Sequence, residues 1–194
     1  MDSQAILEQV FNIHVKQIRN LDKKNQKFLV LFSGITGSGK SYIAKKLEEK
    51  YEGIRINNDD IRDIIENLVS PDNNDNKQKI LLSYLAYLLE KLPKSNGFII
   101  LDSSIDRKFE FVQDFAIKNN FKLFTIRIDL PREIIIKNIL RRTEREAAPY
   151  LSDLDRQIND HQAIIPKIAV DFAISEDNFN RFSDLFSAID RKFN

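Results

Sequence analysis

Residues 34–41 combine glycines, a lysine and a hydroxyl group in a spacing that suits phosphate binding. They fit the pattern G-x-x-x-x-G-K-[ST] and read, in order, Gly34, Ile35, Thr36, Gly37, Ser38, Gly39, Lys40 and Ser41. Glycines let successive backbone N–H groups turn toward phosphate oxygens. Lys40 then reaches the β- and γ-phosphates, and the Ser41 hydroxyl binds Mg²⁺. This segment, the phosphate loop, therefore predicts a site for a nucleoside triphosphate.

The residues on either side of the loop have the pattern that such a loop requires. Residues 28–32 form a short apolar run that is typical of a buried strand. From Lys40 onward the apolar residues Ile43, Ala44 and Leu47 recur with helical spacing. The positive end of that helix would then face the bound phosphates.

Alternating strand and helix patterns continue along the chain. Strands are expected at residues 28–32, 53–57, 98–102, 122–128 and 171–175. Helices are expected after the loop and from Asp59 or Asp60 to 68, then at 77–92, 106–119, from 131, at 152–165 and at 178–192. This order predicts an α/β protein with a three-layer, doubly wound parallel sheet of about five strands, the P-loop NTPase fold. Its ligands bind at the carboxyl ends of the strands.

Asp102 follows four apolar residues at the end of an expected strand, which is the Walker B pattern. Its carboxylate would lie on the same sheet edge as Ser41, so the two side chains are candidate ligands for Mg²⁺. A carboxylate that only caps the strand end is the alternative. The guanine-specific Asn-Lys-x-Asp motif is absent, since the nearest string, residues 76–79, ends in Lys79.

A third polar group follows the second expected strand and reads Asn57, Asn58, Asp59, Asp60, Ile61 and Arg62. This pattern resembles the P-loop kinases of the polynucleotide 5′-kinase and zeta-toxin type, a group also described as AAA-type ATP-binding kinases. The resemblance implies ATP as the phosphoryl donor, Asp59 as the base that accepts the proton of the acceptor hydroxyl, and Arg62 as an acceptor-binding residue. Asp60 is expected to contact the substrate, and it also competes with Asp59 for the role of the base or of the helix cap. The alternative for Asp59 is an N-cap of the following helix.

The resemblance extends over residues 28–175 and includes a basic segment. Similar kinases carry an arginine-bearing lid over ATP, and such an arginine neutralises charge on the transferring phosphoryl group. A lid is therefore expected near 141–150, with Arg142 and Arg145 ranked ahead of Arg141 as catalytic candidates. A solvated, charged helix end is the alternative.

The chain departs from the family pattern beside the phosphate loop. Tyr42 stands where the family usually has a threonine near the α-phosphate, so Tyr42 is included among the expected nucleotide-binding residues. Thr36 stands where a proline is frequent.

Residues 1–27 are expected to form an amphipathic helix, at 3–21, and a linker, ahead of a kinase-like domain at 28–194. The helix either packs on the outside of the domain or binds a partner. The 194 residues suit one domain, and the formal net charge of +1 predicts neither a nucleic-acid footprint nor attraction to a membrane. With no cysteine, leader pattern or apolar membrane span in view, a cytoplasmic protein is expected.

The predicted function is an ATP-dependent phosphotransferase that moves the γ-phosphate to a hydroxyl of a small molecule or a nucleic acid. A nucleic acid is the less favoured acceptor because no basic stripe alternates with aromatic residues. The alternative is a nucleotide-dependent switch that hydrolyses ATP slowly and binds a partner through the amino-terminal helix. His14 and His161 are expected to be ordinary surface or helix-face residues.

Overall fold

The computed structural model describes residues 3–16, 27–69, 74–91, 97–106, 108–141 and 144–193. The helices are α1 (Ser3–Lys16), α2 (Lys40–Tyr51), α3 (Asn58–Leu68), α4 (Asn74–Lys91), α5 (Phe109–Lys118), α6 (Arg132–Ile139), α7 (Glu144–Ser152), α8 (Leu154–Ile164) and α9 (Phe182–Phe193). The strands are β1 (Lys27–Ser33), β2 (Ile54–Ile56), β3 (Gly97–Ser104), β4 (Phe121–Ile128) and β5 (Phe172–Ile174). Two short 3₁₀ turns lie at Ile165–Lys167 and Glu176–Asn178.

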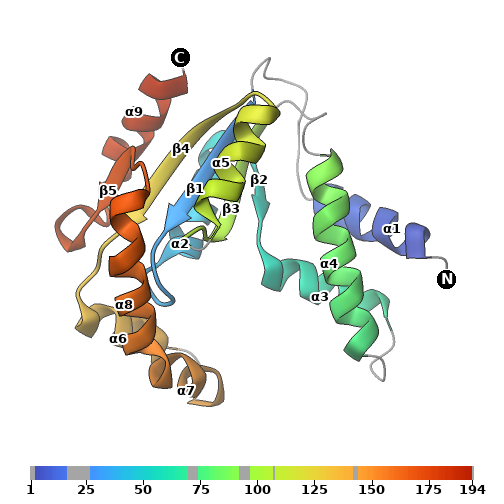
Figure 1. Cartoon of the computed structure of the whole chain (residues 1–194), viewed down its shortest axis with the longest axis horizontal. Coiled ribbons are helices and arrows are strands. Elements are labelled where there is room, and N and C mark those ends of the chain that lie inside the picture. Colours follow the sequence, from blue (N-terminus) through green and yellow to red (C-terminus); the bar gives the residue numbers. More distant parts are fainter. Residues whose placement is uncertain are drawn as a thin grey trace.

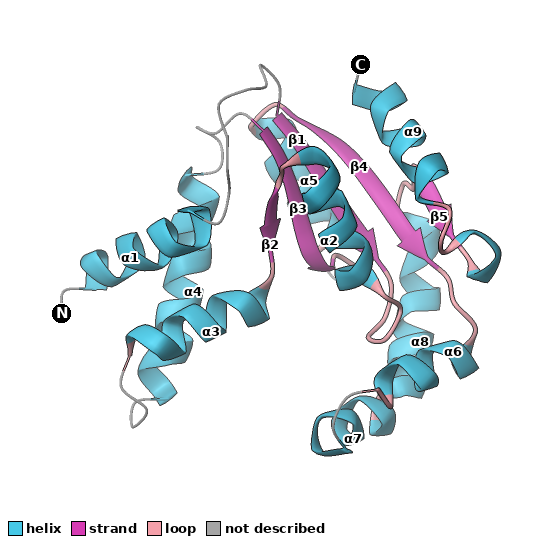
Figure 2. Cartoon of the chain, turned by 180° about the vertical axis from the view of Figure 1, so that it is seen from behind, coloured by secondary structure: helices cyan, strands magenta, loops and turns pink. Residues whose placement is uncertain are grey.

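The five strands form one parallel sheet in the order β2-β3-β1-β4-β5, with helices on both faces (Figures 1 and 2). This arrangement confirms the predicted three-layer α/β fold. Because β1 is the central strand, the phosphate loop that follows it begins at the middle of the carboxyl edge. The other four strands also end on this edge, because parallel strands run in the same direction. The segments that follow β2, β3, β4 and β5 therefore begin there.

Alternate side chains of β1 belong to two separate cores. Phe28, Val30 and Phe32 pack with residues of α2 and α9 on one face. Leu29 and Leu31 pack on the other face in the core that also contains residues of α1, α3, α4 and α5. Successive side chains of a strand point to opposite faces, so a continuous apolar strand needs helices on both sides.

Helix α1 packs against α3 and α4 beside β2 (Figure 1). Its Val10 is fully buried, and His14, which was expected at the surface or on a helix face, is 4% exposed. His14 Nδ1 lies 2.8 Å from Tyr84 Oη, and His14 Nε2 lies 3.2 Å from the main-chain oxygen of Arg55. A neutral ring that donates from Nε2 and accepts at Nδ1 satisfies both contacts, and burial lowers the pKa of His14. The end of the predicted helix, residues 17–21, lies outside the described residues.

Helix α7 is not predicted by the sequence pattern, because Pro149 and the charged residues before it obscure the periodicity. A small third core explains why the helix forms there. Ala147 of α7 packs with Ile135 and Ile139 of α6 and with Ile35 of the phosphate loop. These contacts offset the one backbone hydrogen bond that a proline cannot donate.

None of the helices in the described segments is both long and apolar enough to cross a membrane.

Candidate active site

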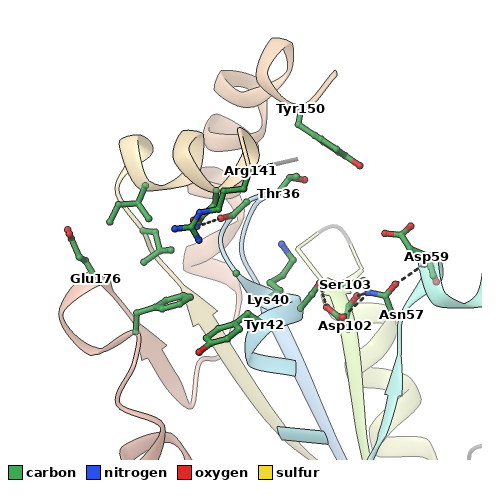
Figure 3. A pocket seen from close by; sticks show the side chains of 18 of the residues that line it. Thr36, Lys40, Tyr42, Asn57, Asp59, Asp102, Ser103, Arg141, Tyr150 and Glu176 are labelled. Atoms are coloured by element: carbon green, nitrogen blue, oxygen red, sulfur yellow. Dashed lines mark hydrogen bonds between the residues drawn. The ribbon is translucent and has the colours of Figure 1, made fainter. Parts of the chain in front are cut away.

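A cavity of about 880 Å³ opens at the carboxyl edge of the sheet (Figure 3). Six residues of the phosphate loop and the start of α2 line it: Thr36, Gly37, Gly39, Lys40, Ser41 and Tyr42. The start of α3, the end of β3, the α6–α7 region and the segment after β5 form the remaining walls. Gly34 instead lines a neighbouring cavity of about 410 Å³, and Ser38 is fully buried within the loop.

The backbone of the phosphate loop requires glycine at two positions. Gly37 and Gly39 have φ values of +83° and +91°, in the left-handed region that favours glycine. A Cβ atom on Gly37 would lie 2.8 Å from Ile139 Cγ1, and one on Gly39 would lie 2.6 Å from Phe179 Cζ. The loop is therefore shaped by its own backbone and by helices and turns from distant parts of the chain.

Lys40 lies at the junction of the loop and α2. Its Nζ donates hydrogen bonds of 3.0 Å to the oxygen of Gly34 and 2.7 Å to the oxygen of Ile35. The N-cap of α2 is Gly39, and no side chain caps this helix end. The first N–H groups of an uncapped helix favour an anion, so this end of α2 suits a phosphate group.

Ser41 and Asp102 come together at the base of the cavity. Ser41 Oγ donates a 2.9 Å hydrogen bond to Asp102 Oδ1, and the Asp102 side chain is 1% exposed. A hydroxyl and a carboxylate are the hard oxygen ligands that Mg²⁺ prefers, so these two residues fit the ion. Within the described part of the chain no group of three or more His, Cys, Asp or Glu side chains could hold a metal.

The second oxygen of Asp102 accepts hydrogen bonds from two residues to which the sequence pattern assigned no role. Asp102 Oδ2 accepts a hydrogen bond of 2.6 Å from Arg55 Nη1 and one of 2.7 Å from Asn57 Nδ2. Burial disfavours the charge on Arg55, but the carboxylates around it outweigh that effect and raise its pKa. Arg55 lies between two isoleucines of β2, where a single charged residue gives no signal of a site.

Asp59 and Asp60 diverge at the start of α3. The N-cap is Asn57, whose Oδ1 accepts hydrogen bonds from the N–H groups of Asp59 and Asp60, so the N-cap alternative for Asp59 is wrong. Asp59 lines the cavity, and its Oδ1 accepts a 2.6 Å bond from Arg62 Nη1. Asp60 instead pairs with Arg55 and lines a separate cavity of about 550 Å³ beside α1. The expected substrate contact of Asp60 is therefore not supported by its position.

The α6–α7 region brings one candidate lid arginine into the cavity. Arg141 lines the wall above the phosphate loop (Figure 3). Arg142 lies outside the described residues, and so does the side chain of Arg145 in α7. Tyr150 of α7 also lines the cavity, on the wall opposite Asp59.

Two further side chains contact the phosphate loop from helices remote in sequence. Asn138 Nδ2 of α6 donates a 2.9 Å bond to the main-chain oxygen of Gly37. Gln157 Oε1 of α8 accepts a 3.3 Å bond from the N–H group of Thr36. Their positions follow from helix packing, and no sequence motif marks them.

Tyr42 forms an aromatic wall with residues of the carboxyl-terminal segment. Its ring stacks on Phe179 with 6.0 Å between centroids and 10° between planes, and it meets the edge of Phe182 at 5.8 Å. Tyr42 and Phe179 both line the cavity, so this departure from the family pattern gives an apolar surface next to the loop.

The sequence profile of the AAA domain family matches residues 29–163. No curated protein is similar enough in sequence to be matched. A chain from the PezAT chromosomal toxin–antitoxin system of Streptococcus pneumoniae has the same fold, with 14% identity and a TM-score of 0.62 over 88% of this chain and 76% of that one. A chain of the AvrRxo1-ORF1:-ORF2 complex with ATP has 18% identity and a TM-score of 0.51 over 75% of this chain. The match spans only 50% of the AvrRxo1 complex chain.

These similarities agree with the resemblance drawn from the motifs, at the level of family and fold. The family profile covers more than half of the sequence and includes the phosphate loop, the Asp59–Arg62 segment and Asp102. The structural neighbours share the fold of this chain. The chain therefore belongs to the AAA domain family.

Proposed function

We propose that this protein is an ATP-dependent phosphotransferase that moves the γ-phosphate of ATP to a hydroxyl group of a separate acceptor. The observation that carries the proposal is that one cavity contains both the phosphate loop and the carboxylate of Asp59. A nucleotide switch needs only the loop, whereas a kinase also needs a base where the acceptor hydroxyl would lie.

The donor half of the site consists of Lys40, Ser41 and Asp102. Lys40 would release its contacts with the loop carbonyls and bind the β- and γ-phosphates. Ser41 and Asp102 would hold Mg²⁺, which would neutralise negative charge on the phosphates. Arg141, at the wall above the loop, is the described arginine best placed to stabilise the transferring group.

The acceptor half consists of Asp59, Arg62 and Tyr150. Asp59 would accept the proton of the attacking hydroxyl, and Arg62 forms an ion pair with this carboxylate. Tyr150 offers a ring and a hydroxyl from the opposite wall. We also propose that residues 141–150 act as a lid and that residues 28–194 form a kinase domain.

A small molecule is the favoured acceptor. Among the described residues that line the cavity, three carry positive charge (Lys40, Arg62 and Arg141) and three carry negative charge (Asp59, Asp102 and Glu176). A groove for a nucleic-acid strand is expected to be strongly basic. The switch alternative relied on α1 as a free partner-binding helix, but Val10 and His14 of α1 are buried in the domain.

The test is transfer from γ-labelled ATP to a panel of nucleosides, nucleotides, sugars and oligonucleotides. With the acceptor found, Asp59→Asn should bind ATP normally but lose roughly 10²- to 10⁴-fold in transfer rate. Asp63→Asn is the matched control, because Asp63 lies on the same helix outside this cavity. Unchanged transfer by Asp59→Asn would exclude Asp59 as the base, and normal ATP binding by Lys40→Ala would exclude the donor site.

A further inference from the structure

The guanidinium group of Arg55 contacts three carboxylates from three different elements. Nη1 donates a 2.6 Å bond to Asp102 of β3, Nε donates a 3.1 Å bond to Glu48 of α2, and Nη2 pairs with Asp60 of α3. The Arg55 side chain is only 10% exposed. One buried side chain therefore joins the helix that follows the phosphate loop, the helix that carries Asp59, and the strand that carries Asp102.

The contacts divide the two oxygens of Asp102 between different partners. Oδ2 accepts from Arg55 and Asn57, which both lie at the β2 end of the sheet. Oδ1 accepts from the Ser41 hydroxyl and so faces the place where Mg²⁺ would bind. A carboxylate held in this way cannot rotate its two oxygens freely, so its orientation toward the ion is set before the ion arrives.

The same guanidinium group separates the two adjacent aspartates. Asp60 is turned toward Arg55, while Asp59, one residue earlier, lines the cavity. Because Arg55 holds Asp60 on the far side of α3, one carboxylate of the pair is left to face the acceptor.

We propose that Arg55 is a positioning residue that orients Asp102 toward the metal and keeps Asp60 out of the cavity. The inference rests on the proposed function, since it assigns Asp102 to the metal of the donor site. It gives Arg55 no contact with substrate. Its planar fork suits the role, because three separate nitrogens each face a different carboxylate, whereas a lysine donates from a single nitrogen.

The test compares Arg55→Lys with the parent protein by titrating Mn²⁺ into the ATP complex and following free Mn²⁺ by electron paramagnetic resonance. ATP affinity in the presence of EDTA is measured separately by calorimetry. Arg55→Lys should keep the metal-free affinity for ATP and lose roughly 10- to 100-fold in Mn²⁺ affinity, as expected for a residue that orients a metal ligand. Arg127→Lys is the control, because Arg127 lies on another strand of the sheet and pairs with a single, more exposed carboxylate, that of Asp129.

The outcomes separate this inference from the proposed function. If the parent protein binds no ATP with Mn²⁺, the proposed function fails and the inference fails with it. If the parent binds both and Arg55→Lys holds Mn²⁺ equally well, the inference alone is overturned. Equal losses of ATP affinity with and without metal would also overturn it, since they would indicate a general role in folding. Circular dichroism checks each fold, and Arg55→Gln, a neutral donor, provides the comparison if Arg55→Lys does not fold.

Discussion

Ser41 and Asp102 are 61 residues apart in the chain, yet Ser41 Oγ donates a hydrogen bond of 2.9 Å to Asp102 Oδ1. The contact joins the first turn of α2 to β3, the strand next to β1 in the sheet. The two residues lie close together in space because parallel strands end at one edge of the sheet, where the segments that follow them meet.

Asp102→Asn should lower both metal binding and stability. The amide keeps the shape of the side chain but removes the charge that pairs with the buried guanidinium of Arg55. Breaking a buried ion pair from one side costs about 3 kcal/mol. Urea unfolding measures this loss, and Mn²⁺ titration measures the metal affinity. A variant as stable as the parent would show that Arg55 finds enough compensation from Glu48 and Asp60.

Gly39→Ala should weaken ATP binding at least tenfold, an effect of about 1.4 kcal/mol. The new Cβ would sit 2.6 Å from the Phe179 ring and would stand on a backbone with φ of +91°. Calorimetry with ATP provides the measurement.

The double variant Gly39→Ala/Phe179→Leu separates these two causes. It should recover only the part of the affinity that is lost to the clash, because the backbone strain remains. Full recovery would mean that the left-handed conformation imposes no cost on alanine here.

Asn138→Ala should lower ATP affinity more than its effect on stability suggests. The side chain donates a 2.9 Å bond to the oxygen of Gly37 in the phosphate loop. Asn119→Ala removes a comparable bond, 2.8 Å to the oxygen of Phe115, at the end of α5. Each variant should lose about 1 kcal/mol of stability, but only Asn138→Ala should bind ATP more weakly. Equal ATP affinities would argue against a role for Asn138 in shaping the loop.

Stability should fall as the pH drops below about 6.5 because of His14. Burial lowers the pKa of this imidazole from its usual 6.5. The main-chain oxygen of Arg55 and the charge of Asp60 favour the charged form, and the charge of Arg55 opposes it, but burial outweighs them. Below pH 6.5 the unfolded chain binds a proton that the folded chain does not. The free energy of unfolding therefore falls by up to about 1.4 kcal/mol for each pH unit of acidification. The contribution is fully present above pH 6.5 and is lost on acidification.

Urea unfolding from pH 7.5 to 5 measures this effect, with His14→Gln as the comparison. The variant should lose the part of the pH dependence that His14 supplies. Identical slopes for parent and variant would contradict a neutral, buried His14.

The amino-acid sequence was sufficient to predict the phosphate loop, the parallel α/β fold and the candidate residues at the strand ends. The residues of the phosphate loop are contiguous in the chain, so the spacing of its glycines, lysine and serine is enough to predict its shape. The alternation of apolar strands and amphipathic helices reports which faces must be buried. Asp59 and Asp102 were also found from sequence, because Asp59 comes shortly after β2 and Asp102 lies near the end of β3, and both strands end on the functional edge.

Only the tertiary structure decided how the two aspartates after β2 are used and what holds Asp102. Asp59 and Asp60 are equivalent in the sequence pattern, and they differ because Arg55 binds one of them. Arg55, Asn138 and Gln157 act through contacts with segments 47, 101 and 121 residues away. Such contacts depend on how whole elements pack, and side-chain periodicity along one element contains no information about them. The burial of His14 and the formation of α7 have the same origin, since each depends on the neighbouring helices rather than on its own sequence.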